Sequence, residues 1–439
     1  MSDVMCTEKK KVAVISLGCD KNRVDTENIL YYLGKGGYSA TNDLGEADVI
    51  IINTCAFIKS AEKEAIDTIF EAAEYKKTGR CETLVVAGCL PMRYGNELSE
   101  LLPEVDCFIG MNDYADICGI IDRRDRLSLC GHYTETAKRI LSTPPHYAYL
   151  RIADGCDNRC TYCTIPSIRG KYRSRNPDSL LEEAGYLDDM GVRELIIVAQ
   201  DVTRYGKDLT GEYTLVDLLR RLLAERSFEK IRLLYCYPES VSDELIELVA
   251  SEERMAKYMD VPLQHISDGI LRRMGRRTDS AQIRELFGKL RSRGIAIRTT
   301  FIVGFPGETD EQFLELSDFI SEYEPEHIGV FAYSREDGTP AARMKDQVPA
   351  SVKRKRVNAL GRLAKKLAEK RNASLVGKTL DVIYEDIDYD RNMFVGRTEA
   401  DAPDIDGLVR FTGDFCDVGN VYNVRITGYS GYDLLGEKV

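Results

Sequence analysis

The chain has 439 residues, of which 44% are apolar and 30% charged, and its formal net charge is −12. This length suggests two to four domains, and the composition is typical of a soluble globular protein. It contains no run of roughly 18 apolar residues, which a membrane-spanning helix needs. The net charge argues against indiscriminate nucleic-acid binding but leaves room for a local basic surface.

Thirteen cysteines are present, an odd number. The amino-terminal residues carry charges but no apolar core of a signal peptide, so we expect none. Many cysteines in a chain without a secretory signal indicate metal or redox chemistry in a reducing compartment rather than disulfides. We therefore expect a cytoplasmic protein.

Three buried-strand patterns in the first hundred residues lead into a cysteine each. They are Lys11–Cys19, Asp48–Ile58 and Thr83–Tyr94. Helical patterns lie between them at Val24–Leu33 and Ala61–Tyr75. Strands that alternate with helices predict a parallel sheet with helices on its faces.

Cys19, Cys55 and Cys89 each come just after one of these strands. Because the carboxyl ends of parallel strands meet at one edge, we expect the three cysteines to lie close together. The alternative is that each is a small core residue beneath a turn. The seven cysteines without such a placement receive no role: Cys6, Cys81, Cys107, Cys118, Cys130, Cys236 and Cys416.

A Pro-rich joint at 141–146 predicts a domain boundary. The loop GCDNRCTYCTIPSIRG follows it, with Cys156, Cys160 and Cys163 in a C-x3-C-x2-C spacing. Three thiolates on one short loop can hold three corners of an iron–sulfur cluster and leave one iron open. A zinc knuckle or buried thiols are the alternatives, but His265 is too remote to complete a compact zinc site.

Six strand-like runs alternate with helical patterns after the Pro-rich joint. The runs are Tyr149–Ala153, Leu195–Gln200, Ile231–Tyr237, Tyr258–Leu263, Ile297–Val303 and Ile328–Ala332. The helical patterns include Asp178–Met190, Leu215–Arg226, Asp243–Ser251, Ser280–Arg293 and Asp310–Tyr323. Six units are too few for an eight-stranded barrel, so we expect an open, partial barrel.

Polar residues gather where these strands end, at 200–201, 235–238, 264–265 and 304–308. Turn residues belong at strand ends too, so each group alone is as compatible with structure as with a site. Arg169, Arg173 and Arg175 follow the cysteine loop and could face substrate or carboxylates, although solvated arginines are commoner.

Ser351–Asn372 is a basic helical pattern with nine Lys/Arg against one acid. We expect a solvated face and an apolar stripe on the core, rather than a calmodulin or membrane site. The expected stripe is Val357, Leu360, Leu363 and Leu367.

Short β patterns from Gly377 onward predict a small five-stranded barrel of the OB type. This segment has six Lys/Arg and thirteen Asp/Glu, a net charge of −7. Such a surface repels an RNA backbone and attracts a basic protein. Alternatively, the acids only confer solubility.

The cysteine loop resembles the signature of radical S-adenosylmethionine (SAM) enzymes, in which an aromatic such as Tyr162 precedes the third cysteine. The resemblance implies that the open iron binds SAM and that one electron cleaves it to a 5′-deoxyadenosyl radical. It also implies the open (βα)6 fold and a SAM pocket shaped by Tyr162, Gly304 and Gly307. No strong base is needed for hydrogen-atom abstraction, so His265 is not expected to be one.

LGCDKNRVDTE, NTCAFI and GCLPMRY resemble the amino-terminal motifs of the methylthiotransferase family. The resemblance implies that Cys19, Cys55 and Cys89 hold a second 4Fe-4S cluster whose open iron presents sulfur. The first two motifs are more similar to the branch that modifies a ribosomal protein (RimO) than to the tRNA-modifying branch (MiaB-like). The segment from residue 377 on resembles a TRAM domain.

The resemblance implies an α/β chain of three domains: 1–140, the methylthiotransferase domain; 141–375, the radical-SAM core; and 376–439, the TRAM barrel. The implied reaction is methylthiolation of an aspartate β-carbon in ribosomal protein S-12, with a second SAM as methyl donor. Methylthiolation of a tRNA adenosine, or a non-catalytic iron–sulfur protein, are the alternatives. The implied partners are S-12 or the small ribosomal subunit and a low-potential donor such as flavodoxin or ferredoxin. A monomer is expected, and catalytic residues beyond the six cysteines stay unassigned.

Overall fold

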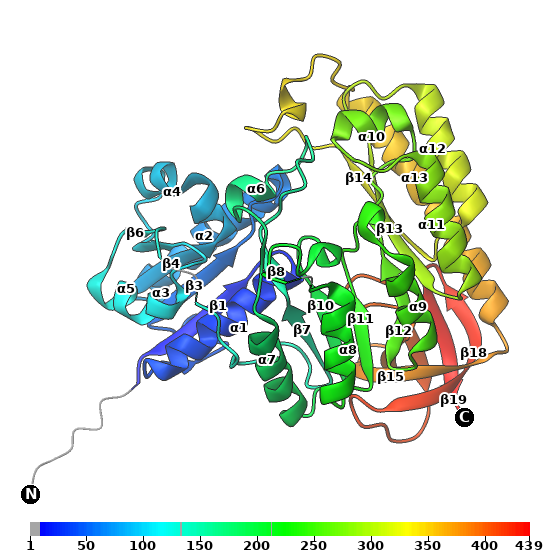
Figure 1. Cartoon of the computed structure of the whole chain (residues 1–439). Coiled ribbons are helices and arrows are strands. Elements are labelled where there is room, and N and C mark those ends of the chain that lie inside the picture. The colour runs from blue at the N-terminus through cyan, green and yellow to red at the C-terminus, as the bar shows by residue number, and fades with distance from the viewer. Residues whose placement is uncertain (1–8, 132–133, 212) are drawn as a thin grey trace, which may run out of the picture. The chain divides into compact units, whose positions relative to one another are not determined.

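The computed structural model describes residues 9–131, 134–211 and 213–439 (Figure 1). Cys6 and the start of the chain, where we expected no signal peptide, lie outside these residues. Among the helices described, none has both the length and the apolar character needed to cross a membrane. The chain forms two compact units. One comprises residues up to 143 with 149–157 and 163–186, and the other comprises 144–148, 158–162 and 187–439.

The first unit is built on a six-stranded parallel sheet with the order β2-β1-β3-β4-β5-β6. Its strands are β1 (Lys11–Ser16), β2 (Ser39–Ala40), β3 (Val49–Thr54), β4 (Thr83–Gly88), β5 (Cys107–Ile109) and β6 (Leu127–Ser128). Every residue of β3 and β4 is buried, as their unbroken apolar sequences require when helices cover both faces of a sheet. The predicted parallel α/β architecture is confirmed.

Helices connect these strands: α1 (Asp20–Lys35), α2 (Lys59–Ala73), α3 (Tyr75–Thr78), α4 (Cys89–Leu101), the 3-10 turn η1 (Tyr114–Asp116) and α5 (Ile117–Arg123). The predicted helices correspond to α1 and α2. The pattern did not predict α4, which begins at Cys89 itself. Proline has no backbone N–H, but Pro91 lies in the first turn of α4, where N–H groups have no partner within the helix.

The first unit also contains the segments on either side of the cysteine loop. They form β8 (Ala153–Asp154), β9 (Arg173–Ser174), α6 (Ile165–Ile168) and α7 (Pro177–Asp189). β8 and β9 pair antiparallel. Ile168 of α6 is buried in the same apolar core as the strands of the six-stranded sheet.

The second unit contains the predicted open sheet, with the order β14-β13-β12-β11-β10-β7. Its strands are β7 (Tyr147–Arg151, which begins in this unit), β10 (Glu194–Val198), β11 (Lys230–Leu233), β12 (Met255–Asp260), β13 (Ala296–Val303) and β14 (His327–Ala332). The connecting elements are η2 (Val202–Arg204), α8 (Leu215–Glu225), η3 (Pro238–Ser240), α9 (Asp243–Ser251), α10 (Asp268–Met274), α11 (Ser280–Ser292), α12 (Asp310–Tyr323) and η4 (Ala341–Arg343). The partial barrel of six strands is confirmed, and α10 is the helix that the periodicity did not predict.

The basic helix is α13 (Ala350–Leu375). Its buried stripe differs from the expected one: Leu360 is buried, whereas Val357, Leu363 and Leu367 are half-buried. The buried positions repeat every four residues and include the small Ala364. Small side chains let a helix approach its neighbours closely, which a search for large apolar residues does not detect.

The carboxy-terminal segment forms a closed barrel with the order β15-β16-β17-β19-β18, drawn in red and orange in Figure 1. The strands are β15 (Thr379–Asp388), β16 (Met393–Thr398), β17 (Val409–Thr412), β18 (Val421–Ser430) and β19 (Asp433–Lys438). Closure pairs β17 with β19 in parallel. The predicted five-stranded barrel is confirmed, while the division at 140/141 and 375/376 stays a prediction.

Candidate functional site

The three amino-terminal cysteines lie together at the carboxyl edge of the first unit's sheet. Cys19 is the residue before α1, Cys55 follows β3 directly, and Cys89 is the first residue of α4. The thiols of Cys19 and Cys55 both act electrostatically on that of Cys89. Two of the three therefore stand at helix amino termini, where the backbone favours a thiolate.

A glycine precedes both Cys19 and Cys89 because no side chain fits there. Gly18 has φ +90°, and a Cβ on it would lie 2.6 Å from the Cβ of Cys55. Gly88 has φ +92°, and its Cβ would lie 2.8 Å from the carbonyl oxygen of Thr54. The Gly-Cys pairs therefore let neighbouring strand ends approach closely.

Asn22 joins the loops that carry Cys19 and Cys55. Its side-chain nitrogen donates to the carbonyl oxygens of Leu17 at 3.0 Å and of Thr54 at 2.8 Å. The side chain of Asn53 donates in return to the Asn22 carbonyl oxygen at 2.8 Å. The bonds to Thr54 and between Asn53 and Asn22 are buried and the bond to Leu17 is part-buried, so together they hold the two loops in one arrangement.

Burial governs the thiols themselves. It raises the pKa of Cys89 to about 12, and the Arg169 guanidinium offsets part of that rise. Burial also raises the pKa of Cys55, with a further contribution from Cys19. A metal bound at these thiols would replace their protons and hold them as thiolates.

Three thiols at one sheet edge are a donor set that fits an iron–sulfur cluster. Across residues 9–131, 134–211 and 213–439, no three His, Cys, Asp or Glu side chains converge closely enough for one metal ion. A cubane cluster binds each thiolate at a different iron, so its cysteines stand farther apart than the ligands of one ion. Three neighbouring thiols at one sheet edge, two of them on helix termini, fit such a group.

The second cysteine set spans eight consecutive residues, from Cys156 to Cys163. The loop is closed at its base, where the Cys156 N–H donates to the carbonyl oxygen of Gly170 at 3.1 Å. Gly155 has φ +73°, and a Cβ there would lie 2.8 Å from that same oxygen. Cys156 is buried and Cys163 half-buried.

Cys160 belongs to the second unit, where its Sγ lies 2.7 Å from the hydroxyl of Tyr237. The guanidinium of Arg276 stands over the Tyr237 ring at 3.9 Å from its centroid. The Nε and Nη1 atoms of Arg276 are buried and have no hydrogen-bond partner. The sequence placed Tyr237 in the polar group at 235–238 without a role and did not single out Arg276, because only the fold brings these two side chains to Cys160.

Tyr162 packs against an apolar cluster that contains Phe305, the residue directly after Gly304. The rings of Tyr162 and Phe305 meet edge to face, with centroids 6.4 Å apart. Gly304 and Gly307 have φ +72° and +81°, values that favour glycine. The carboxylate of Glu308 accepts from the N–H groups of Gly304 and Phe305, which holds the turn. The role of these residues toward SAM stays a prediction.

His265 is fully buried, and its Nδ1 accepts from the N–H of Ser267 at 3.0 Å. Burial and the nearby Arg356 lower its pKa to about 3. It therefore stays neutral near pH 7 and does not take up a proton there. This agrees with the expectation that it is not the base of the reaction.

Two of the three arginines that follow the cysteine loop face carboxylates. The side chain of Arg169 is 2% exposed and pairs with Asp25 and Asp154. Arg175 pairs with Glu183, whereas Arg173 is exposed. The sequence could not separate these cases, because both partners of Arg169 come from other segments.

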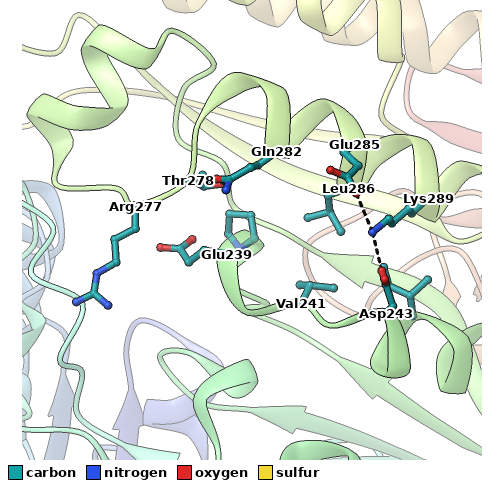
Figure 2. Close-up of a pocket in the computed structure, with 11 residues that line it drawn as sticks. Glu239, Val241, Asp243, Arg277, Thr278, Gln282, Glu285, Leu286 and Lys289 are labelled. Carbon is teal, nitrogen blue, oxygen red and sulfur yellow. Dashed lines mark hydrogen bonds and ion pairs between the residues drawn. The ribbon is translucent and has the colours of Figure 1, made fainter.

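A polar cleft of about 230 Å³ lies beside the end of β11 in the second unit (Figure 2). Lys289 stands between two carboxylates, 2.7 Å from Asp243 and 2.9 Å from Glu285. Its described lining contains no cysteine: Pro238, Glu239, Val241, Asp243, Ile246, Arg277, Thr278, Gln282, Glu285, Leu286 and Lys289. We assign no cluster chemistry to this cleft.

Three family models match the chain in succession. Residues 11–110 match the uncharacterized protein family UPF0004, residues 150–320 the radical SAM superfamily, and residues 376–439 the TRAM domain. Among solved structures, the radical SAM methyltransferase TsrM from Kitasatospora setae is similar in fold. Its TM-score is 0.56 at 14% identity, over 76% of this chain and 74% of that one.

Curated relatives are similar over nearly their whole length. The ribosomal protein uS12 methylthiotransferase RimO of Pelobacter propionicus is 49% identical over 442 residues, covering 98% of each chain. That of Geotalea uraniireducens is 48% identical, covering 98% of this chain and 99% of that one. Identity at this level over whole chains means that the protein belongs to the RimO family of ribosomal protein uS12 methylthiotransferases.

Proposed function

We propose that this protein is a radical-SAM methylthiotransferase that modifies the β-carbon of an aspartate in ribosomal protein uS12. Its cofactors are two 4Fe-4S clusters and SAM. The observation that carries the proposal is the meeting of Cys19, Cys55 and Cys89 at one sheet edge in a RimO-family chain. SAM cleavage and hydrogen-atom abstraction need only the SAM-binding cluster, so the amino-terminal cysteines are available for a further step such as sulfur transfer.

Cys156, Cys160 and Cys163 would hold the cluster that binds SAM, and the amino-terminal set would hold the second cluster. When bound, these groups supply the electron that cleaves SAM and the sulfur that is transferred. The chain's own contribution is placement. Asn22 fixes two ligand loops, and the neutral His265 leaves hydrogen removal to the radical.

The carboxy-terminal barrel supplies a surface for a basic partner. Seven of its carboxylates are exposed: Asp381, Asp386, Asp390, Asp404, Asp414, Asp417 and Glu437. Phe415, between two of these acids in sequence, is 78% exposed, and Tyr389 is 84% exposed. Carboxylates beside exposed aromatic rings attract Lys and Arg side chains by charge and by cation–π contact. A basic ribosomal protein fits this surface, whereas an RNA backbone is repelled.

We extend the proposal to the setting of the enzyme. The protein acts in the cytoplasm as a monomer and receives electrons from a low-potential donor such as flavodoxin or ferredoxin. Clusters that need a strong reductant, in a chain with thirteen cysteines, suit a reducing compartment. Sedimentation of the reconstituted protein and reduction by each donor would test these points.

The test of the ligand assignment is an iron count after anaerobic reconstitution. Cys19, Cys55 and Cys89 changed together to Ala should remove about four of about eight irons, while SAM cleavage to 5′-deoxyadenosine survives. The same change at Cys156, Cys160 and Cys163 should remove the other four and abolish cleavage. Absence of 5′-deoxyadenosine from the unaltered protein would leave a non-catalytic iron–sulfur protein as the better description.

The substrate is tested by mass spectrometry of uS12 and of tRNA from cells with and without the protein. We expect methylthio-aspartate in uS12 only when it is present. Unmodified uS12 with a methylthio-adenosine that depends on the protein would establish the tRNA reaction instead. Asp414→Lys with Asp417→Lys should weaken uS12 binding and leave SAM cleavage unchanged.

A further inference from the structure

Arg169 lies six residues after Cys163 in sequence, yet its guanidinium reaches the amino-terminal cysteine set. Its Nη2 atom lies 3.8 Å from the Sγ of Cys89 and donates to the Oδ1 of Asn22 at 2.7 Å. All of these residues belong to the first unit. One side chain from the segment after Cys163 therefore contacts a cysteine of the amino-terminal set.

Two carboxylates hold this guanidinium in place. Nη2 lies 2.9 Å from Asp25, and Nη1 lies 3.1 Å from Asp154. Arg151 contacts both of these carboxylates as well. Arg169 is thus a fixed, permanent positive charge beside a buried sulfur.

We propose that Arg169 is a positioning residue that orients Cys89 as an iron ligand and raises the midpoint potential of the second cluster. This inference rests on the proposed function. Hydrogen bonds to ligand sulfurs and nearby positive charge favour the more negative, reduced cluster, so they raise its potential. The couple concerned takes up one electron and breaks no bond.

Asp25 allows the direction of the change in midpoint potential to be tested. Its carboxylate helps to hold Arg169 and also places negative charge near Cys89. Removal of the arginine charge should lower the potential, whereas removal of the aspartate charge should raise it. A merely structural role would move both variants in the same direction or neither, because each breaks the same ion pair.

The experiment uses the full chain with Cys156, Cys160 and Cys163 changed to Ala, so that only the second cluster contributes. The parent and each variant are reconstituted, their iron is counted, and the reduced cluster is titrated by EPR with dithionite as reductant. At the potential where half of the parent cluster is reduced, Arg169→Gln should leave about a quarter or less reduced. Asp25→Asn should leave more than half reduced, and Arg169→Lys should stay near the parent.

Arg139→Gln is the matched control. Arg139 is 1% exposed and pairs with Glu27 and Glu183, and within the described part of the chain it contacts no cysteine thiol, so its loss should not move the potential. Equal potentials for Arg169→Gln and the parent, both holding about four irons, would overturn the inference. If Arg169→Gln cannot hold iron, Asp25→Asn at or below the parent potential overturns it. A parent that assembles no cluster would instead overturn the proposed function.

Discussion

The side-chain nitrogen of Asn22 lies 2.8 Å from the carbonyl oxygen of Thr54, the residue directly before Cys55. The same nitrogen donates to Leu17 at 3.0 Å, two residues before Cys19. One amide therefore sets the spacing between two cysteine loops that are more than thirty residues apart in sequence.

Asn22→Ala removes the side-chain donor to these two carbonyl oxygens, at a cost of about 1–3 kcal/mol for the buried bond to Thr54 and less for the part-buried bond to Leu17. We expect a lower unfolding temperature and loss of iron from the amino-terminal set, with SAM cleavage retained. Iron analysis and calorimetry measure both. Asn96→Ala, at an exposed position of α4, is the control and should change neither. Full iron content in Asn22→Ala would show that the loops keep their spacing without the amide.

Gly18→Ala should introduce both backbone strain and a steric clash, whereas Gly37→Ala should introduce backbone strain alone. Both glycines have φ near +90°, but a Cβ on Gly18 meets Cys55 at 2.6 Å, whereas nothing lies within 4 Å of one on Gly37. Gly37→Ala should cost only the left-handed strain of about 1–2 kcal/mol. Gly18→Ala should cost more and reduce iron binding at the amino-terminal set. The unfolding temperature and the iron content of the two variants are compared. Equal values for both would mean that the close approach of Gly18 to Cys55 is unimportant.

Tyr237→Phe removes the hydroxyl that lies 2.7 Å from the Sγ of Cys160. When Cys160 is an iron ligand, this hydroxyl donates to its thiolate and raises the cluster potential. The variant should therefore show a more negative midpoint potential for the SAM-binding cluster and an unchanged one for the second cluster. Redox titration by EPR distinguishes the two. Tyr422→Phe, in the carboxy-terminal barrel, is a control in which neither potential should move.

We expect low pH to reduce the stability of the second unit, because Glu194 becomes protonated. This buried carboxylate accepts from Arg232 at 2.7 Å and also pairs with Arg397 of the barrel. Burial would raise the pKa of Glu194, but the two guanidiniums outweigh it and hold that pKa at about 2. A carboxyl with a lowered pKa stabilises the folded state fully above its ordinary pKa. That contribution is lost as the pH falls from about 4.5 to about 2.

Glu194→Gln should destabilise the protein by about 3–5 kcal/mol at pH 7, because it leaves two buried guanidiniums short of a charge. The difference from the parent should shrink as the pH falls toward 2. Unfolding temperatures across this range test it. Glu225→Gln, which breaks an exposed pair with Arg221, should cost no more than about 1 kcal/mol. A constant difference between parent and Glu194→Gln at every pH would contradict the assignment.

Local patterns were sufficient to predict most of the architecture. Buried parallel strands were predicted from the β-branched run at Ile50–Ile52 and from the repeated Gly-Cys endings. The structure confirms them as β3 and β4. Helix α4 was not predicted because its first turn contains Cys89 and Pro91, and these residues resemble the turn at the end of a strand rather than the start of a helix. The buried stripe of α13 was misplaced because alanines, rather than leucines, make part of its packed face.

The sequence by itself determined the two cysteine sets, since chain spacing and strand-end position are local properties. Only the tertiary structure decided what surrounds them. Arg169 contacts Cys89, and Tyr237 contacts Cys160, across 80 and 77 residues of sequence. Such contacts depend on how strands and loops fold back on one another, and no local pattern encodes them. Ligand identity is thus readable along the chain, whereas the charges and hydrogen bonds that tune the ligands are set by packing.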